Sequence, residues 1–202
     1  MFNEKLNSIE EALKERLDAE RYHHTLGVMY TSAALAMKYG ESVEKALLAG
    51  LLHDCAKCMP KDEKLLTARK FKDELNITDF EIENPHLLHG KLGVRTAKEE
   101  FGITDNDILN AVANHTKGRL GMSLLEKIIF TADLIEPGRD ENVITGLKEI
   151  RKTAFEDIDL CVLMITEQTL HYLEKTNRPI DHDTVTTYEH YKKVIEERRT
   201  SH

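Results

Sequence analysis

Apolar residues recur along most of the chain with a spacing near 3.6 residues, and this spacing predicts helices. The expected helices are a first segment with apolar residues at Leu6, Ile9, Leu13 and Leu17, then 20–39, 42–53, a helix from Pro60, 86–101, 104–115, 122–135, 157–175 and 183–199. No alternating stretch is long enough to predict a strand. The pattern therefore predicts an all-α protein.

Residues with a preference for helix ends mark several of these boundaries. Gly40 follows 20–39 as a helix-ending glycine, and Ser42 is a good first cap for 42–53. Thr104, with Asp107 three residues later, is expected to cap 104–115. The segment 42–53 is apolar over most of its length, so we expect it at the centre of the fold.

Composition narrows the class of protein. Of 202 residues, 41% are hydrophobic and 32% are charged, which is typical of a globular chain. The formal net charge of −8 argues against general binding to nucleic acid or anionic membranes. No stretch approaches the roughly 18 apolar residues of a membrane span, and the first residues lack a signal-peptide pattern. Three cysteines do not make a disulfide framework, so we expect a cytoplasmic protein.

Polar side chains of the metal-ligand type stand at the ends of the most apolar segments. They are His24, His53 with Asp54, His89, His115 and Asp133. Burying a carboxylate or an imidazole without a partner costs several kcal/mol. Any one of them alone is more often a hydrogen-bonded core residue than a ligand. Such residues occur on five different segments, and a single metal site would explain all of them together. A helical bundle can gather ligands around metal in this way.

Five short segments around these residues resemble the motifs of the YqeK family, within the HD-domain superfamily of metal-dependent phosphohydrolases. The segments are Arg21–Val28, His53–Lys57, His89–Gly93, His115–Gly118 and Ala132–Arg139. The resemblance covers about 17–180 and implies an HD-type helical bundle with a metal site in its core. We expect a single domain, 1–202, in which 17–140 form the metal-binding core and 141–202 are C-terminal helices packed on it.

The resemblance also implies a centre with two divalent metal ions. It assigns His24, His53, Asp54 and Asp133 to one ion, and Asp54, His89 and His115 to the other, with Asp54 bridging. Imidazole and carboxylate ligands suit iron, manganese, zinc or nickel, and the resemblance favours iron. The lack of thiolate ligands argues against a closed structural zinc site.

The activity implied by the resemblance is symmetrical hydrolysis of a dinucleoside tetraphosphate, such as diadenosine tetraphosphate, into two molecules of ADP. A hydroxide that bridges the metals would attack an inner phosphorus. The catalytic residues would be Asp54, Lys57 and Arg139, since the two cations can hold phosphate oxygens. The expected substrate contacts are Arg21, Lys57, Thr116, Gly118 and Arg139.

Two other functions use the same residues. One is a different HD nucleotide phosphohydrolase: a nucleotidase, a deoxynucleoside triphosphatase or an alarmone hydrolase. The other is a non-catalytic, nucleotide-sensing helical domain. The complete ligand set argues against the second, because a degenerate site is expected to have lost a ligand.

Some assignments stay open at the level of the sequence. His86 lies one turn before His89 and is an alternative ligand, whereas His23 is expected to be structural or to support a ligand. Cys55 and Cys58 form a C-x-x-C pair, which can be a redox pair or half a zinc site but is more often incidental. A homodimer through the charged C-terminal end is also open. Four other histidines are expected at the surface: His171, His182, His190 and His202.

Overall fold

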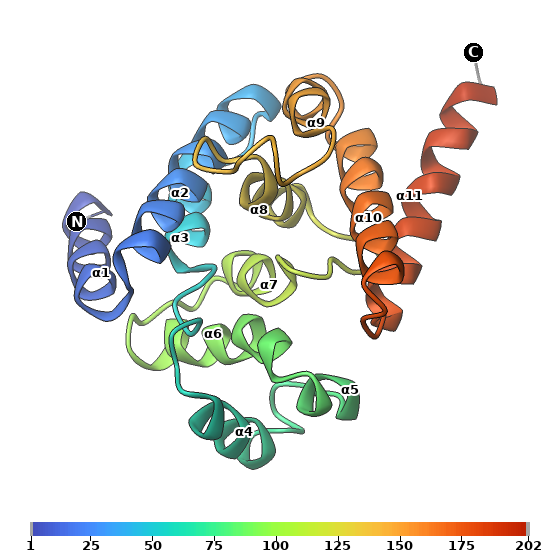
Figure 1. The fold of residues 1–202 in the computed structure, drawn as a ribbon. Helices are drawn as coiled ribbons and strands as arrows, with labels where there is room; N and C mark the ends of the chain where they lie inside the picture. The colour runs from blue at the N-terminus through green and yellow to red at the C-terminus, as the bar shows by residue number, and fades with distance from the viewer. Residues whose placement is uncertain (1, 201–202) are drawn as a thin grey trace.

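The computed structural model describes residues 2–200, and in this range the chain is a bundle of α-helices joined by short loops (Figure 1). The helices are α1 (Phe2–Arg16), α2 (Ala19–Tyr39), α3 (Val43–Leu52), α4 (Lys61–Lys70), α5 (Asp79–Glu83), the 3-10 helix η1 (Pro85–Leu87), α6 (Leu88–Glu99), α7 (Asn106–Asn114), α8 (Leu124–Ile135), α9 (Leu147–Ala154), α10 (Ile158–Lys175) and α11 (His182–Thr200). No strand occurs between residues 2 and 200, so the all-α prediction is confirmed. The expectation for His202 lies outside the described residues.

The predicted helix-ending residues act as expected around the central hairpin of α2 and α3. Gly40 takes a left-handed conformation with φ of 75°, and its N–H donates to the carbonyl of Ala36. Ser42 then caps α3 by accepting a hydrogen bond from the N–H of Lys45 at 3.3 Å. These two caps fix a short connection, so α2 and α3 run side by side.

Other boundaries differ from the predicted ones. Asp105, not Thr104, caps α7, because its carboxylate accepts the N–H of Asp107 at 2.9 Å. Pro60 is the residue before α4 and not part of its first turn. The expected helix 86–101 is shorter, since η1 precedes α6. The short helices α5 and α9 were not predicted, because five and eight residues hold too few apolar positions for a clear period.

The centre of the molecule is formed by α3, α7 and α8, which contact one another, with α2 and α6 packed beside them. Gly50 allows a close approach of α3 to α2, since a Cβ on this residue would lie 2.8 Å from Cα of Met29. Leu51 and Leu52, at the end of α3, are fully buried. The buried end of α3 therefore leads directly to His53 and Asp54.

The remaining helices surround this centre (Figure 1). On one side α10 packs between α8 and α11, and α9 contacts both α8 and α10. On another side α4 and α5 lie near α6, over a smaller apolar cluster that includes Ala68 and Leu92. Between residues 2 and 200 no helix has the length and apolar character that crossing a bilayer requires.

Candidate metal centre

Five elements of the bundle bring the expected ligands to one place. His24 lies in α2, His53 and Asp54 follow α3 directly, and His89 lies in α6. His115 follows the last residue of α7, and Asp133 lies in the last turn of α8. The four histidines and Asp54 are each less than a tenth exposed, whereas the side chain of Asp133 is 24% exposed. The cluster is therefore a mostly buried site with one open end.

The backbone fixes the orientation of three of the imidazoles. In each of them Nδ1 lies within hydrogen-bond distance of a backbone carbonyl oxygen one turn earlier, and this oxygen can only accept a hydrogen bond. The N···O distances are 2.7 Å from His53 to Gly50, 2.7 Å from His89 to His86, and 2.8 Å from His115 to Val112. The proton of each neutral ring is therefore held on Nδ1, and its Nε2 presents a lone pair.

These Nε2 atoms point toward one another. Nε2 of His53 lies 3.3 Å from Nε2 of His24, and Nε2 of His89 lies 3.0 Å from Nε2 of His115. Burial lowers the pKa of His53 to about 4 and holds the pKa of His89 well below its usual value, so both rings are neutral at pH 7. Facing lone pairs repel one another, and a cation placed among them relieves the repulsion.

Asp54 lies between the two pairs of histidines. Its Oδ1 is 3.3 Å from Nε2 of His89 and 3.5 Å from Nε2 of His115, and its Oδ2 is 3.6 Å from Nε2 of His53. Oδ1 is buried and accepts no hydrogen bond from the described residues. Burial tends to raise the pKa of Asp54, but the groups around it, among them the cation of Lys57 at 3.7 Å, hold it well below its ordinary value, so the group is a carboxylate.

Two groups of three possible ligand atoms therefore share Asp54. His24, His53 and Asp54 form one group, and Asp54, His89 and His115 form the other, with the ligand atoms of each group within 4.8 Å of one another. Buried imidazole and carboxylate ligands, with lone pairs that converge and one oxygen that accepts no hydrogen bond, fit divalent metal ions of the transition series. The cluster thus has the chemistry of a metal centre.

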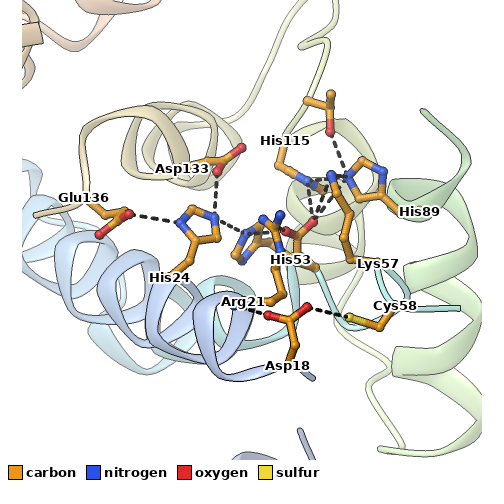
Figure 2. Close-up of polar contacts among 12 residues, drawn as sticks. Asp18, Arg21, His24, His53, Lys57, Cys58, His89, His115, Asp133 and Glu136 are labelled. Carbon is orange, nitrogen blue, oxygen red and sulfur yellow. Dashed lines mark hydrogen bonds and ion pairs between the residues drawn. The ribbon is translucent and has the colours of Figure 1, made fainter. Parts of the chain in front are cut away.

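Asp133 and Glu136 complete the surroundings of His24 (Figure 2). Oδ1 of Asp133 lies 3.0 Å from Nε2 of His24, and Oε1 of Glu136 lies 3.1 Å from Nδ1. Burial tends to raise the pKa of Asp133, but the charges around it, that of Arg139 among them, hold it well below the ordinary value. Sequence reasoning did not single out Glu136, although this residue lies in the segment Ala132–Arg139.

Two glycines make room for the buried carboxylate of Glu136. A Cβ on Gly27 in α2 would overlap Oε2 of Glu136. The N–H of Gly138 donates to the same oxygen at 2.5 Å. Glu136 is therefore held from two sides, and its other oxygen is aimed at His24.

Cationic side chains lie at both ends of the cluster, and a threonine hydroxyl lies at one of them. At one end Nζ of Lys57 and Oγ1 of Thr116 each lie 3.1 Å from Nε2 of His89. At the other end Arg139 donates to Oδ1 of Asp133 at 2.6 Å. Arg21 donates to Oδ2 of Asp54 at 2.8 Å. Lys57, Arg139 and Arg21 are each about one-third exposed, so solvent reaches them while they touch the ligands.

The other expected positions lie differently. Gly118 ends the turn after α7 with φ of 68°, and its N–H already donates to the carbonyl of Asn114 at 2.8 Å. Its backbone N–H is therefore not free for a phosphate. The backbone carbonyl of His86 accepts the hydrogen bond that orients the ring of His89. The ring of His86 itself belongs to neither group of three possible metal ligands.

The two cysteines of the C-x-x-C pair face different partners. Sγ of Cys55 is buried and donates to the carbonyl of Gly93, whereas Cys58 is exposed and faces Asp18. Neither of them is among the grouped ligand atoms of the described residues. The structure therefore gives no support to a redox pair or a zinc half-site.

Comparison with known proteins agrees with this geometry. The family model for the HD domain matches residues 21–138. A Bacillus subtilis protein named bis(5'-nucleosyl)-tetraphosphatase, symmetrical, is 40% identical over 182 residues, which are 89% of this chain and 95% of that protein. A Staphylococcus aureus protein of the same name is 32% identical over 180 residues, 88% and 90% of the two chains.

A solved structure extends the likeness to three dimensions. It is a Clostridium acetobutylicum protein described as an HD superfamily hydrolase involved in NAD metabolism. It superposes with a TM-score of 0.87 at 41% identity, covering 93% of this chain and 96% of that one. From the matched family model, the relatives and the structural likeness, the chain belongs to the HD domain family.

Proposed function

We propose that the protein is a metal-dependent phosphohydrolase that cleaves dinucleoside tetraphosphates, such as diadenosine tetraphosphate, symmetrically into two nucleoside diphosphates. The observation that carries the proposal is the pair of ligand groups that share Asp54. Relatives that cover most of this chain are named for this activity. A centre with two metal ions suits the cleavage of a phosphoric anhydride within a polyphosphate, because the ions stabilise its negative charge.

The ligand roles follow from the two groups. His24, His53, Asp54 and Asp133 would hold one divalent ion, and Asp54, His89 and His115 would hold the second. When bound, two such ions activate a water molecule for attack and neutralise charge on the phosphates. We propose iron as the metal, while manganese, zinc and nickel also suit nitrogen and carboxylate ligands.

The side chains around the cluster are expected to bind the phosphate chain. Lys57 and Thr116 lie at the end near His89, and Arg139 lies at the end near Asp133. Arg21 contacts Asp54 between them. Cations at both ends suit an anion that passes over the centre and extends on both sides. Arg139 can also give two parallel hydrogen bonds to one phosphate.

Two broader proposals rest on the sequence. We propose a cytoplasmic location, because three cysteines in 202 residues do not make a disulfide framework. We also propose a homodimer through the charged end of α11 at 196–199. Light scattering on the purified protein tests the second proposal, and a mass equal to one chain overturns it.

Product analysis tests the proposed function directly. Diadenosine tetraphosphate is incubated with protein purified without chelator, and the products are separated by anion-exchange chromatography. ADP as the only nucleotide product supports symmetrical cleavage. AMP together with ATP contradicts it, because the cut then falls at an outer anhydride. No turnover with iron, manganese, zinc or nickel overturns the assignment.

Two variants connect the activity to the metal centre. Asp54→Asn keeps the shape of the side chain but weakens a ligand that serves both groups, so turnover and metal content are expected to fall together. Glu149→Asn is a control, since Glu149 is 65% exposed and is not among the grouped ligands. An Asp54→Asn protein that keeps full activity and metal content would falsify the shared role.

A further inference from the structure

A groove leads away from the metal centre along α2. Its first part has a volume of about 460 Å³ and is lined by polar residues, including Arg21, His23, His24 and Arg139. Its second part has a volume of about 640 Å³ and continues past the shared residues Gly27 and Pro137. Both volumes lie in the range of small-molecule sites, which is roughly 300–1,000 Å³. The two parts therefore adjoin at Gly27 and Pro137, and together they lie along a path that starts at the metal ligand His24.

One face of α2 forms the floor of this path. Gly27, Tyr30, Thr31 and Ala34 follow one another at helical spacing and line the second part. Ten residues separate His24 from Ala34, which is about 15 Å along a helix. The floor is thus long enough to carry a ligand well beyond the metal centre while one end of that ligand stays at His24.

The second part is apolar and contains exposed aromatic rings. Ile135, Pro137 and Phe155 line it opposite the face of α2. Tyr30 is 63% exposed and Phe155 is 40% exposed, so both present ring surface to solvent. Ala34, which has a small side chain, lines the slot beside these rings. A planar, largely apolar group is the ligand that such a slot suits.

Arg151 holds the wall of the slot in place. Its guanidinium group donates to the carbonyls of Ile135, Glu136 and Arg139 at distances of 2.9, 2.9 and 3.1 Å. These three carbonyls belong to the end of α8 and the turn after it, which also carries Pro137. Arg151 therefore stabilises the one turn that contains both Pro137 of the slot and the cation Arg139.

We propose that this apolar slot binds one of the two nucleosides of the substrate, with its base against Tyr30 and Phe155 and its phosphates running through the polar part of the groove to the metal centre. The inference rests on the proposed function, which requires a substrate with a nucleoside at each end. Figure 2 places Lys57 with His89 on one side of the cluster and His24 with Asp133 on the other. The groove along α2 leaves from the second side.

The polar part of the groove has the charges that this route needs. Arg21 and Arg139 are each about one-third exposed, and both line it. His23, which lines it too, is exposed and is placed to contact a phosphate or a ribose. Two glutamates are among the described lining residues of this part. Glu20 is exposed, whereas Glu136 is buried. A charged middle followed by an apolar end matches a nucleotide, and a protein partner would not need this order.

Steady-state kinetics of slot variants tests the proposal. Tyr30→Ala removes ring surface, and Ala34→Trp fills the slot from the face of α2. Each is expected to raise the KM for diadenosine tetraphosphate about tenfold, the effect of losing one base-stacking contact, with little change in kcat. Inorganic tetraphosphate carries no base, so its inhibition constant as a competitive inhibitor is expected to stay unchanged. Met37→Ala is the matched control, because Met37 is an exposed residue of α2 outside the slot.

The outcomes separate this inference from the proposed function. A wild-type protein without activity on diadenosine tetraphosphate overturns the proposed function and this inference with it. An active wild-type protein whose slot variants keep their KM overturns the slot alone. Equal weakening of diadenosine tetraphosphate and inorganic tetraphosphate also overturns it, since a general structural defect explains that result. A molecular mass that halves in Tyr30→Ala, measured by light scattering, assigns the surface to a second copy of the chain instead.

Discussion

Nδ1 of His24 lies 3.1 Å from Oε1 of Glu136, and the carboxylate is buried. A carboxylate accepts the proton of Nδ1, so the ring presents the lone pair of Nε2 toward His53 and Asp133. The other three histidines of the cluster use backbone carbonyls for the same purpose. His24 is therefore the one histidine of the cluster whose orientation depends on a side chain that can be substituted.

Glu136→Gln is expected to lower metal affinity about 10–100-fold, because partners of this kind fix the tautomer and raise the basicity of a metal-bound imidazole. The amide can offer its N–H₂ group to Nδ1 and then favours the wrong tautomer. Metal content by mass spectrometry and a titration with Mn²⁺ measure the effect. The double variant Glu136→Gln with His24→Ala is expected to lose little more than His24→Ala alone, because both changes act on one ligand. Full metal affinity in Glu136→Gln would show that the contact does not matter.

Gly27→Ala is expected to produce a similar defect without removing any polar group. The new Cβ overlaps Oε2 of Glu136, which is held by the N–H of Gly138, so the carboxylate must turn away from His24. Metal titration of Gly27→Ala and of Gly27→Ala combined with Glu136→Gln measures this. The second substitution is expected to add little to the first. Additive losses would mean that Gly27→Ala acts through the packing of α2 instead.

The long helices of the fold follow from the sequence because their apolar period is strong and their ends carry clear caps, as at Gly40 and Ser42. The short helices α5 and α9 do not, since five and eight residues hold too few apolar positions for a clear period. The N-terminus of α7 shows a subtler limit. Thr104 and Asp105 are both good caps, and only the local backbone decides that Asp105 accepts the N–H of Asp107.

The ligands could be predicted because imidazole and carboxylate groups are unexpected at the ends of apolar helices. Their supporting residues could not. Glu136 is one of many glutamates in the chain, and its burial depends on Gly27, which is distant in sequence. Nothing in the apolar pattern around Lys117 predicts that this lysine is buried, yet it is only 7% exposed. Both acquire their roles from contacts between elements that are far apart in the sequence.

Lys117 joins three acidic residues from separate parts of the chain. Its Nζ lies 3.0 Å from Oε1 of Glu81, 3.1 Å from Oδ2 of Asp181 and 3.0 Å from Oδ2 of Asp183. Burial tends to lower the pKa of Lys117, but these carboxylates raise it above the ordinary value, so the amine stays charged. The contacts tie α5 and the start of α11 to the turn that follows His115.

Lys117→Met is expected to lower the free energy of unfolding by about 3–5 kcal/mol, because it leaves the buried Asp181 without its cation and removes one of the two lysines that pair with the buried Glu81. Urea denaturation followed by circular dichroism measures the change. Lys152→Met is the control, since Lys152 is 63% exposed and its pairing with Glu149 is a surface contact worth about 0–1 kcal/mol. Equal stability of the two variants would mean that the buried network adds nothing beyond a surface pair.

Thiol reactivity distinguishes the three cysteines. Burial raises the pKa of Cys55 and of Cys161 to about 12, whereas Cys58 is exposed. The thiolate is the reactive form, so at pH 8 the folded protein is expected to react with Ellman's reagent at Cys58 alone. All three thiols should react in guanidinium chloride, and Cys58→Ser should remove the fast reaction. A second fast thiol in the folded protein, assigned to Cys55 by peptide mapping, would contradict its burial and reopen the C-x-x-C pair as a redox site.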